Sequence, residues 1–143
     1  MRVKLDLSKT PVYNTTIEVT ISDINYGNHM GNDRFLTLMQ EARLRWLQSL
    51  GFKNEKDIEN TVGLIVVDAA IQFKAEVFHG ERLNVSLALD EISGKGFDLY
   101  YVVVKEDNKL AAIGKTGILC YDYQARKVVS IPNNLLSVLP QQS

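Results

Sequence analysis

The sequence predicts an α+β fold in which an antiparallel sheet of about five strands wraps around one long central helix. Two observations lead to this prediction: a single strongly apolar helical segment in the first third of the chain, and a series of strand-like segments after it. A helix that is apolar around most of its surface needs enclosure, and a twisted sheet provides it. All 143 residues, 1–143, are expected to form a single domain.

The helix is predicted over residues 33–50. Apolar side chains recur along it at steps of three and four residues, which defines a buried face; they are Phe35, Leu38, Met39, Ala42, Trp46 and Leu50. Asn32 or Asp33 is expected to cap the N-terminus, because both side chains accept hydrogen bonds from a first turn. Gly51 is expected directly after the helix, where a residue with positive φ ends many helices.

Strand patterns lie on both sides of this helix. A half-buried strand is expected over residues 17–21, and the longest one over residues 64–77, where every second residue is apolar. Further strands are expected over 83–89, 97–105, 110–123 and 127–131, followed by a small helix over 132–139. Gly114 and Gly117 interrupt the last long strand, which indicates a bulge or a close approach of other backbone.

Composition narrows the possible functions. The net charge is −1 with both signs mixed, so nothing favours nucleic acid, which binds clustered basic surface. No run of about 18 apolar residues is available to span a membrane, and Asp6 interrupts the position where a signal peptide has its apolar centre. Cys120 is the only cysteine and there are two histidines, so we expect a cytoplasmic protein without metal or cofactor. Exposed sheet edges predict a homodimer or a dimer of dimers.

A polar loop, residues 22–32, leads directly into the helix. Its Asn and Gly residues let the backbone turn with N–H groups that point away from the chain. At a helix N-terminus such groups attract an anion or a carbonyl oxygen. The loop is therefore the best candidate for a functional site.

The loop and the helix together resemble the hotdog-fold acyl-CoA thioesterases of the 4-hydroxybenzoyl-CoA thioesterase-like family. Members carry a DxDxxGHVNNxxY segment before a helix that contains EAR and ends in LG. Here the segment reads DINYGNHMGN from Asp23, and Glu41-Ala42-Arg43 and Leu50-Gly51 follow in the helix. The resemblance covers nearly the whole chain, with the loop and helix as its specific part, and it implies a hotdog fold and an acyl-CoA substrate.

In this family a carboxylate acts as base or nucleophile on a thioester whose carbonyl is polarised by N–H groups at the helix start. The resemblance implies that Met30, Gly31 and Asn32 supply these substrate-binding donors. It also places Asn25 where the family carries its catalytic Asp. An amide cannot take up a proton, but it can orient water or donate to a carbonyl.

Asn25, His29, Asp23, Asp33 and Asp68 are the candidates for the catalytic chemistry. His29 suits a general base because imidazole exchanges protons near neutral pH, although it also suits a hydrogen bond within the turn. Each carboxylate has a structural alternative as well: Asp23 as a cap of the polar turn, Asp33 as a partner of the helix dipole. Asp68 interrupts the apolar part of the long strand and is expected either to be hydrogen-bonded or to reach the site, from its own or a partner subunit.

Two other functions stay open. A hotdog hydratase or dehydratase carries DxN followed by His, but with a shorter spacing that contains Pro, where this chain has Tyr26-Gly27-Asn28. A non-catalytic acyl-thioester binding module is favoured by the amide at Asn25. Hydrolysis of an acyl-CoA thioester is the predicted function, and acyl-CoA is the predicted partner.

Overall fold

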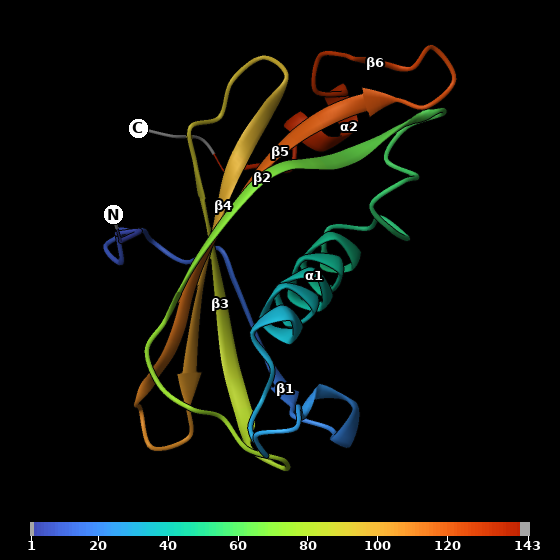
Figure 1. Ribbon diagram of the computed structural model, residues 1–143. Helices are drawn as coiled ribbons and strands as arrows, with labels where there is room; N and C mark the ends of the chain where they lie inside the picture. Colours follow the sequence, from blue (N-terminus) through green and yellow to red (C-terminus); the bar gives the residue numbers. More distant parts are fainter. Residues whose placement is uncertain (1, 141–143) are drawn as a thin grey trace.

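The structure, a computed structural model, describes residues 2–140. Its elements are β1 (Tyr13–Glu18), a 3-10 turn η1 (Ile21–Asp23), α1 (Asn32–Ser49), β2 (Val62–Phe73), β3 (Arg82–Asp90), β4 (Gly96–Lys105), β5 (Leu110–Asp122), β6 (Lys127–Val128) and α2 (Asn133–Leu136). The strands form one antiparallel sheet in the order β1-β3-β4-β5-β2, and β6 pairs with β5. Figure 1 shows α1 on one side of the curved sheet and the N-terminal segment on the other.

The predicted α+β architecture of a long helix against an antiparallel sheet is confirmed. The sheet has six strands rather than about five, because residues 127 and 128 pair with β5. Among residues 2–140, no helix combines the length and apolarity needed to cross a membrane.

The predicted helix is confirmed, with bounds one residue earlier at each end. The predicted N-cap is wrong: Gly31 occupies that position, in extended conformation, and no side chain caps the first turn. Backbone hydrogen bonds hold Met30 and Gly31 in the preceding loop, so Asn32 becomes the first helical residue. Gly51 follows the helix with φ +102°, as expected for the residue after a C-cap.

The sheet-facing side of α1 carries a polar network in an otherwise apolar core. Arg43 is 4% exposed; its guanidinium pairs with Glu55 and donates to the Tyr101 hydroxyl at 2.9 Å. That hydroxyl also hydrogen-bonds Thr116 Oγ1 at 2.7 Å. Burial opposes the charge, but Tyr101 and Glu55 together hold the pKa of Arg43 above its ordinary value. The network fixes the rotation of α1 against β4 and β5.

Three strands end at least three residues earlier than their sequence patterns indicate. β6 stops at Val128 instead of residue 131. β1 stops at Glu18, and the chain turns through η1, where Ile21 is 74% exposed. β2 stops at Phe73 instead of Val77, although the apolar alternation continues. The ladder becomes irregular there, because the N–H groups of Lys74 and Ala75 both donate to the Ala111 carbonyl of β5. Two residues later the partner changes, and the Val77 carbonyl accepts a hydrogen bond from the Met30 N–H in the loop before α1.

Gly114 lies where α1 crosses β5. A methyl group on its Cα would lie 2.5 Å from Sδ and Cε of Met39, a side chain of α1 that is fully buried. The neighbour at this glycine is a side chain and not other backbone as predicted: Met39 of α1 packs directly against the bare backbone of the strand.

We expect Gly114→Ala to lower the free energy of unfolding by about 1–3 kcal/mol, because the buried Met39 must repack around the added methyl group. Urea unfolding measures the change. Gly94→Ala is the matched control, since nothing lies within 4 Å of an added methyl group there; it should change stability by less than about 0.5 kcal/mol. Equal stability of the two variants would contradict the packing described.

Candidate active site

The loop before α1 is a short hairpin tied at its base. Ile24 and Met30 form an antiparallel bridge. Above it, the Asn25 N–H donates to the His29 carbonyl at 2.9 Å, and the Asn28 N–H donates to the Asn25 carbonyl at 3.1 Å. Asn28 closes the turn with φ +65°, a conformation that Asn tolerates well. The loop is therefore an ordered turn that brings Asn25 and His29 together.

Two of the three predicted backbone donors are already used inside the protein. The Met30 N–H donates to the Val77 carbonyl at 2.7 Å, and the Gly31 N–H donates to the Asp23 carbonyl at 3.0 Å. The prediction that Met30 and Gly31 offer their amides to a substrate is thus wrong. The N–H groups of Asn32 and Asp33, the first two of α1, have no hydrogen-bond partner within residues 2–140, as is usual in a first helical turn. Asn32 and Asp33 are therefore the residues at the start of α1 whose amides are open within residues 2–140.

The side chains of Asn25 and His29 both lie close to Gly27. Asn25 Oδ1 and His29 Nε2 each lie 3.3 Å from the point that a Cβ on Gly27 would occupy. The Asn25 oxygen accepts the Gly27 N–H at 2.9 Å, so the NH2 group is the part of this side chain left to act as a donor. His29 Nδ1 lies 3.1 Å from the Met30 carbonyl, which only accepts, so Nδ1 carries the proton and Nε2 is the basic nitrogen of the neutral ring.

Asp23 has a structural task. Its Oδ2 accepts hydrogen bonds from the Thr20 N–H at 2.9 Å and the Thr20 hydroxyl at 3.2 Å. Its Oδ1 lies 3.4 Å from Arg34 Nε in the first turn of α1. Both oxygens are thus engaged, which supports Asp23 as a cap of the polar turn rather than as a base.

Asp33 and Asp68 lie in different places. Asp33 is exposed, and its Oδ1 lies 2.7 Å from the point that a Cβ on Gly31 would occupy, so its carboxylate is beside the open amides. Asp68 accepts hydrogen bonds from Lys115 Nζ at 2.7 Å and the Gly117 N–H at 2.9 Å. The bond from Lys115 is the main reason that the pKa of Asp68 lies below its ordinary value.

Asp68 does not reach the loop of its own chain. Lys115 precedes Thr116, whose side chain contacts Tyr101 beneath α1. Because successive side chains of a strand point to opposite faces, Lys115 and its partner Asp68 lie on the outer face, away from α1. A place for Asp68 in the site of its own subunit is therefore wrong, and a contribution to a second copy stays a prediction.

A cleft of about 260 Å³ opens beside the start of α1. We call it the acyl cleft; it is lined by His29, Met30, Asn32, Phe35 and residues 73–77. Phe35 and Phe73 pack edge to face, with ring centroids 5.4 Å apart. In the described part of the chain, no group of three or more His, Cys, Asp and Glu side chains is placed to hold a metal ion.

Sequence reasoning missed Lys74 and Glu76 in this cleft. Both lie within the strand predicted over residues 64–77, whereas in the structure they belong to the connection between β2 and β3. The sequence carries no local signal for this difference, because the hydrogen-bond partners of residues 74–77 are Ala111 and Met30, which lie far away along the chain.

The sequence profile of the thioesterase-like superfamily matches residues 19–139, and the chain belongs to this family. A putative esterase from Aquifex aeolicus is 28% identical over 128 residues, 90% of this chain and 96% of its own. The long-chain acyl-CoA thioesterase FadM of Escherichia coli is 23% identical over 89% of this chain and 96% of its own.

A solved structure is also similar, that of a 1,4-dihydroxy-2-naphthoyl-CoA thioesterase from Synechocystis. It has 25% sequence identity and a TM-score of 0.80, covering 87% of this chain and 93% of its own. The predicted hotdog fold and the predicted thioesterase family are confirmed by these similarities.

The two roles considered for Asp23 can be separated by substitution. We expect Asp23→Asn to keep most of the activity, because an amide oxygen still accepts the Thr20 N–H. Asp23→Ala should lower the free energy of unfolding by about 1 kcal/mol through loss of the cap, and should lower kcat because the loop is less well held. Steady-state kinetics and urea unfolding measure both. If Asp23→Asn and Asp23→Ala both lower kcat by about 100-fold or more, Asp23 acts as a base and not as a cap.

Proposed function

We propose that this protein hydrolyses an acyl-CoA thioester whose carbonyl oxygen is held by the N–H groups of Asn32 and Asp33. The supporting observation is that these two amides have no partner within residues 2–140 and lie at the positive end of an 18-residue helix. A thioester oxygen becomes negatively charged when its carbon is attacked, and N–H groups aimed at it stabilise that charge. Membership of the thioesterase-like superfamily supports the same reaction.

In the proposed step, His29 Nε2 takes a proton from a water molecule as the water oxygen attacks the carbonyl carbon. The C–S bond then breaks, and the proton passes to the departing CoA thiolate. The NH2 group of Asn25 orients the water, since its oxygen is held by Gly27. The carboxylate of Glu76, which lines the same cleft, stabilises the imidazolium formed on His29. We propose that the reaction uses neither a metal nor a cofactor.

Thiol release from a panel of short, medium, long and aromatic acyl-CoA esters tests this function. We expect release by the wild-type protein, and a fall in kcat of about 100-fold or more for His29→Gln, which keeps a polar side chain but cannot accept the proton. His79→Gln, on the exposed connection after β2, is the control and should retain activity. No release above buffer from a folded sample, for any ester, would refute the proposal.

The same samples distinguish the other two functions. A hydratase would remove the absorbance of an enoyl-CoA without releasing thiol. A binding module would bind CoA esters saturably without turnover. We prefer hydrolysis to these two functions because the chain belongs to the thioesterase-like superfamily.

The protein's own thiol should not disturb this assay. Cys120 is fully buried, and burial raises the pKa of its thiol to about 11. At pH 8 only roughly a thousandth of such a thiol is the reactive thiolate. Thiol-reactive dye should thus report released CoA alone.

We further propose that two copies pair through β2, in the cytoplasm. β2 is an end strand of the sheet. Its middle exposes Val66 (46%) and Val67 (51%). An apolar strand with unpaired backbone groups at a sheet edge tends to pair with another copy. The acyl cleft lies at the end of this strand, so a second copy would form part of its wall.

Val67→Lys should convert the dimer, or a dimer of dimers, into smaller species, because a charged side chain at the edge opposes strand pairing. Light scattering coupled to size-exclusion chromatography measures the mass. Val138→Lys, at an exposed position outside the sheet, serves as the control. A wild-type protein that is monomeric at high concentration would contradict this assembly.

A further inference from the structure

A second hollow borders the acyl cleft at the end of β2. This hollow, of about 340 Å³, is lined by Arg2, Val3 and residues 71–74, and we call it the Arg2–Lys74 hollow. Phe73 and Lys74 line both spaces. The two spaces therefore meet at Phe73 and Lys74, at the edge of the sheet where β2 ends.

The Arg2–Lys74 hollow has two cations and no carboxylate among its lining residues. Neither Arg2 nor Lys74 forms an ion pair with another residue of 2–140, whereas Lys9, Lys105 and Lys115 each pair with Asp or Glu. Two neighbouring cations repel each other, and an anion between them removes that repulsion. The lining thus favours an anionic group.

The N-terminal segment is positioned to keep Arg2 at this hollow. The Leu5 N–H donates to Gln72 Oε1 at 2.9 Å, which ties the segment to β2. Further along, Lys9 pairs with Asp90 at 2.7 Å and lies over the Tyr100 ring. Figure 1 shows this segment on the side of the sheet opposite α1. Arg2 is therefore held beside β2 by contacts of the residues that follow it.

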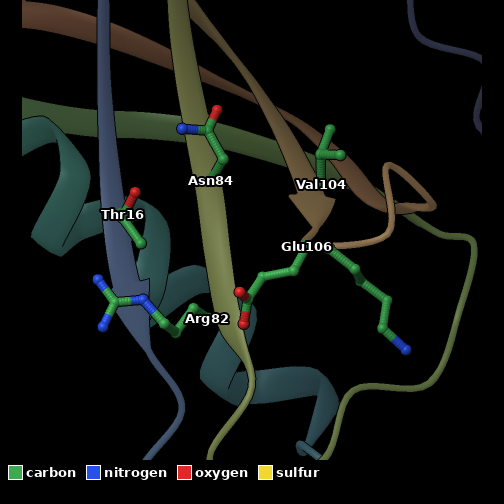
Figure 2. Close-up of a pocket in the computed structure, with 6 residues that line it drawn as sticks. Thr16, Arg82, Asn84, Val104 and Glu106 are labelled. Carbon is green, nitrogen blue, oxygen red and sulfur yellow. The ribbon is translucent and has the colours of Figure 1, made fainter.

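A third hollow, shown in Figure 2, provides a comparison. Its volume is about 190 Å³, and Arg82 and Lys105 are among its lining residues. Glu106 lines it as well, and Lys105 pairs with Glu81 at 3.3 Å. Its charges are balanced within the protein, so it lacks the excess of positive charge found at Arg2 and Lys74.

We propose that Arg2 and Lys74 bind phosphate groups of the CoA part of the substrate. The proposal rests on the proposed function, which provides a ligand with a thioester at one end and phosphates at the other. A guanidinium binds phosphate through paired N–H groups, and an ammonium binds it as a point charge. The acyl group then lies at α1, and the nucleotide end lies at the Arg2–Lys74 hollow.

Two substrates with the same acyl group test this assignment: the acyl-CoA, and the acyl-N-acetylcysteamine thioester, which lacks every phosphate. We expect Arg2→Gln and Lys74→Gln each to raise KM for the acyl-CoA at least about five-fold. The value of kcat should change little, because the contact is made equally before and during reaction. KM for the truncated thioester should stay unchanged in both variants.

Lys53→Gln is the matched control, since Lys53 is exposed on the connection after α1 and lines neither space. The assignment is overturned if either variant leaves KM for the acyl-CoA unchanged, or if KM rises equally for both substrates. Thermal unfolding midpoints identify any variant that is misfolded.

A failure of hydrolysis gives a different result. If the wild-type protein cleaves neither substrate, the thioesterase proposal fails, and calorimetric titration with CoA itself then tests the phosphate contact without turnover. Weaker CoA binding by Arg2→Gln and Lys74→Gln than by Lys53→Gln supports the contact, and equal binding by all three refutes it.

Discussion

The site depends on one backbone hydrogen bond, from the Met30 N–H to the Val77 carbonyl at 2.7 Å. This bond joins the loop before α1 to the connection after β2, two segments far apart along the chain. Both residues are almost fully buried, and an unpaired amide in such a place is costly, so the bond is maintained. It places His29 and Asn32 opposite residues 73–77 and thereby forms the acyl cleft. Lys74, which lines both this cleft and the second hollow, lies in the same connection after β2.

Contacts with the sheet fix the position of α1, the helix that carries the N–H groups of Asn32 and Asp33. Gly114 lets α1 approach β5 closely at Met39, and Arg43 joins the helix to Tyr101 and Glu55. Removing one partner of a buried charge leaves the other without compensation, so this network resists displacement. The direction of α1, and with it the aim of its first N–H groups, is set by the core. The core contacts of α1 and the loop that precedes it thus both determine where the N–H groups of Asn32 and Asp33 point.

The sequence predicted what depends on local pattern. Apolar residues spaced three or four positions apart predicted the bounds of α1 to within one residue, and Gly51 predicted where it ends. What it did not predict depends on distant partners. Which amides stay open was decided by Val77 and Asp23, and no spacing within the loop reveals such acceptors. The outer position of Asp68 follows from strand register, where a shift of one residue exchanges the two faces, and β2 has such a shift between Val66 and Asp68.

The absence of a side-chain cap on α1, with Gly31 at the N-cap, links helix stability to the chemistry. In most helices a Ser, Asp or Asn oxygen satisfies the first N–H groups. In the proposed complex an oxygen of the acyl group takes that part, so that the ligand accepts the hydrogen bonds that no side chain of the protein accepts. A residue that capped α1 internally would strengthen the helix and compete with the substrate for the same two donors. Without a side-chain cap the first turn of α1 is less stable, but its N–H groups remain available to a ligand, whose binding would stabilise the folded protein.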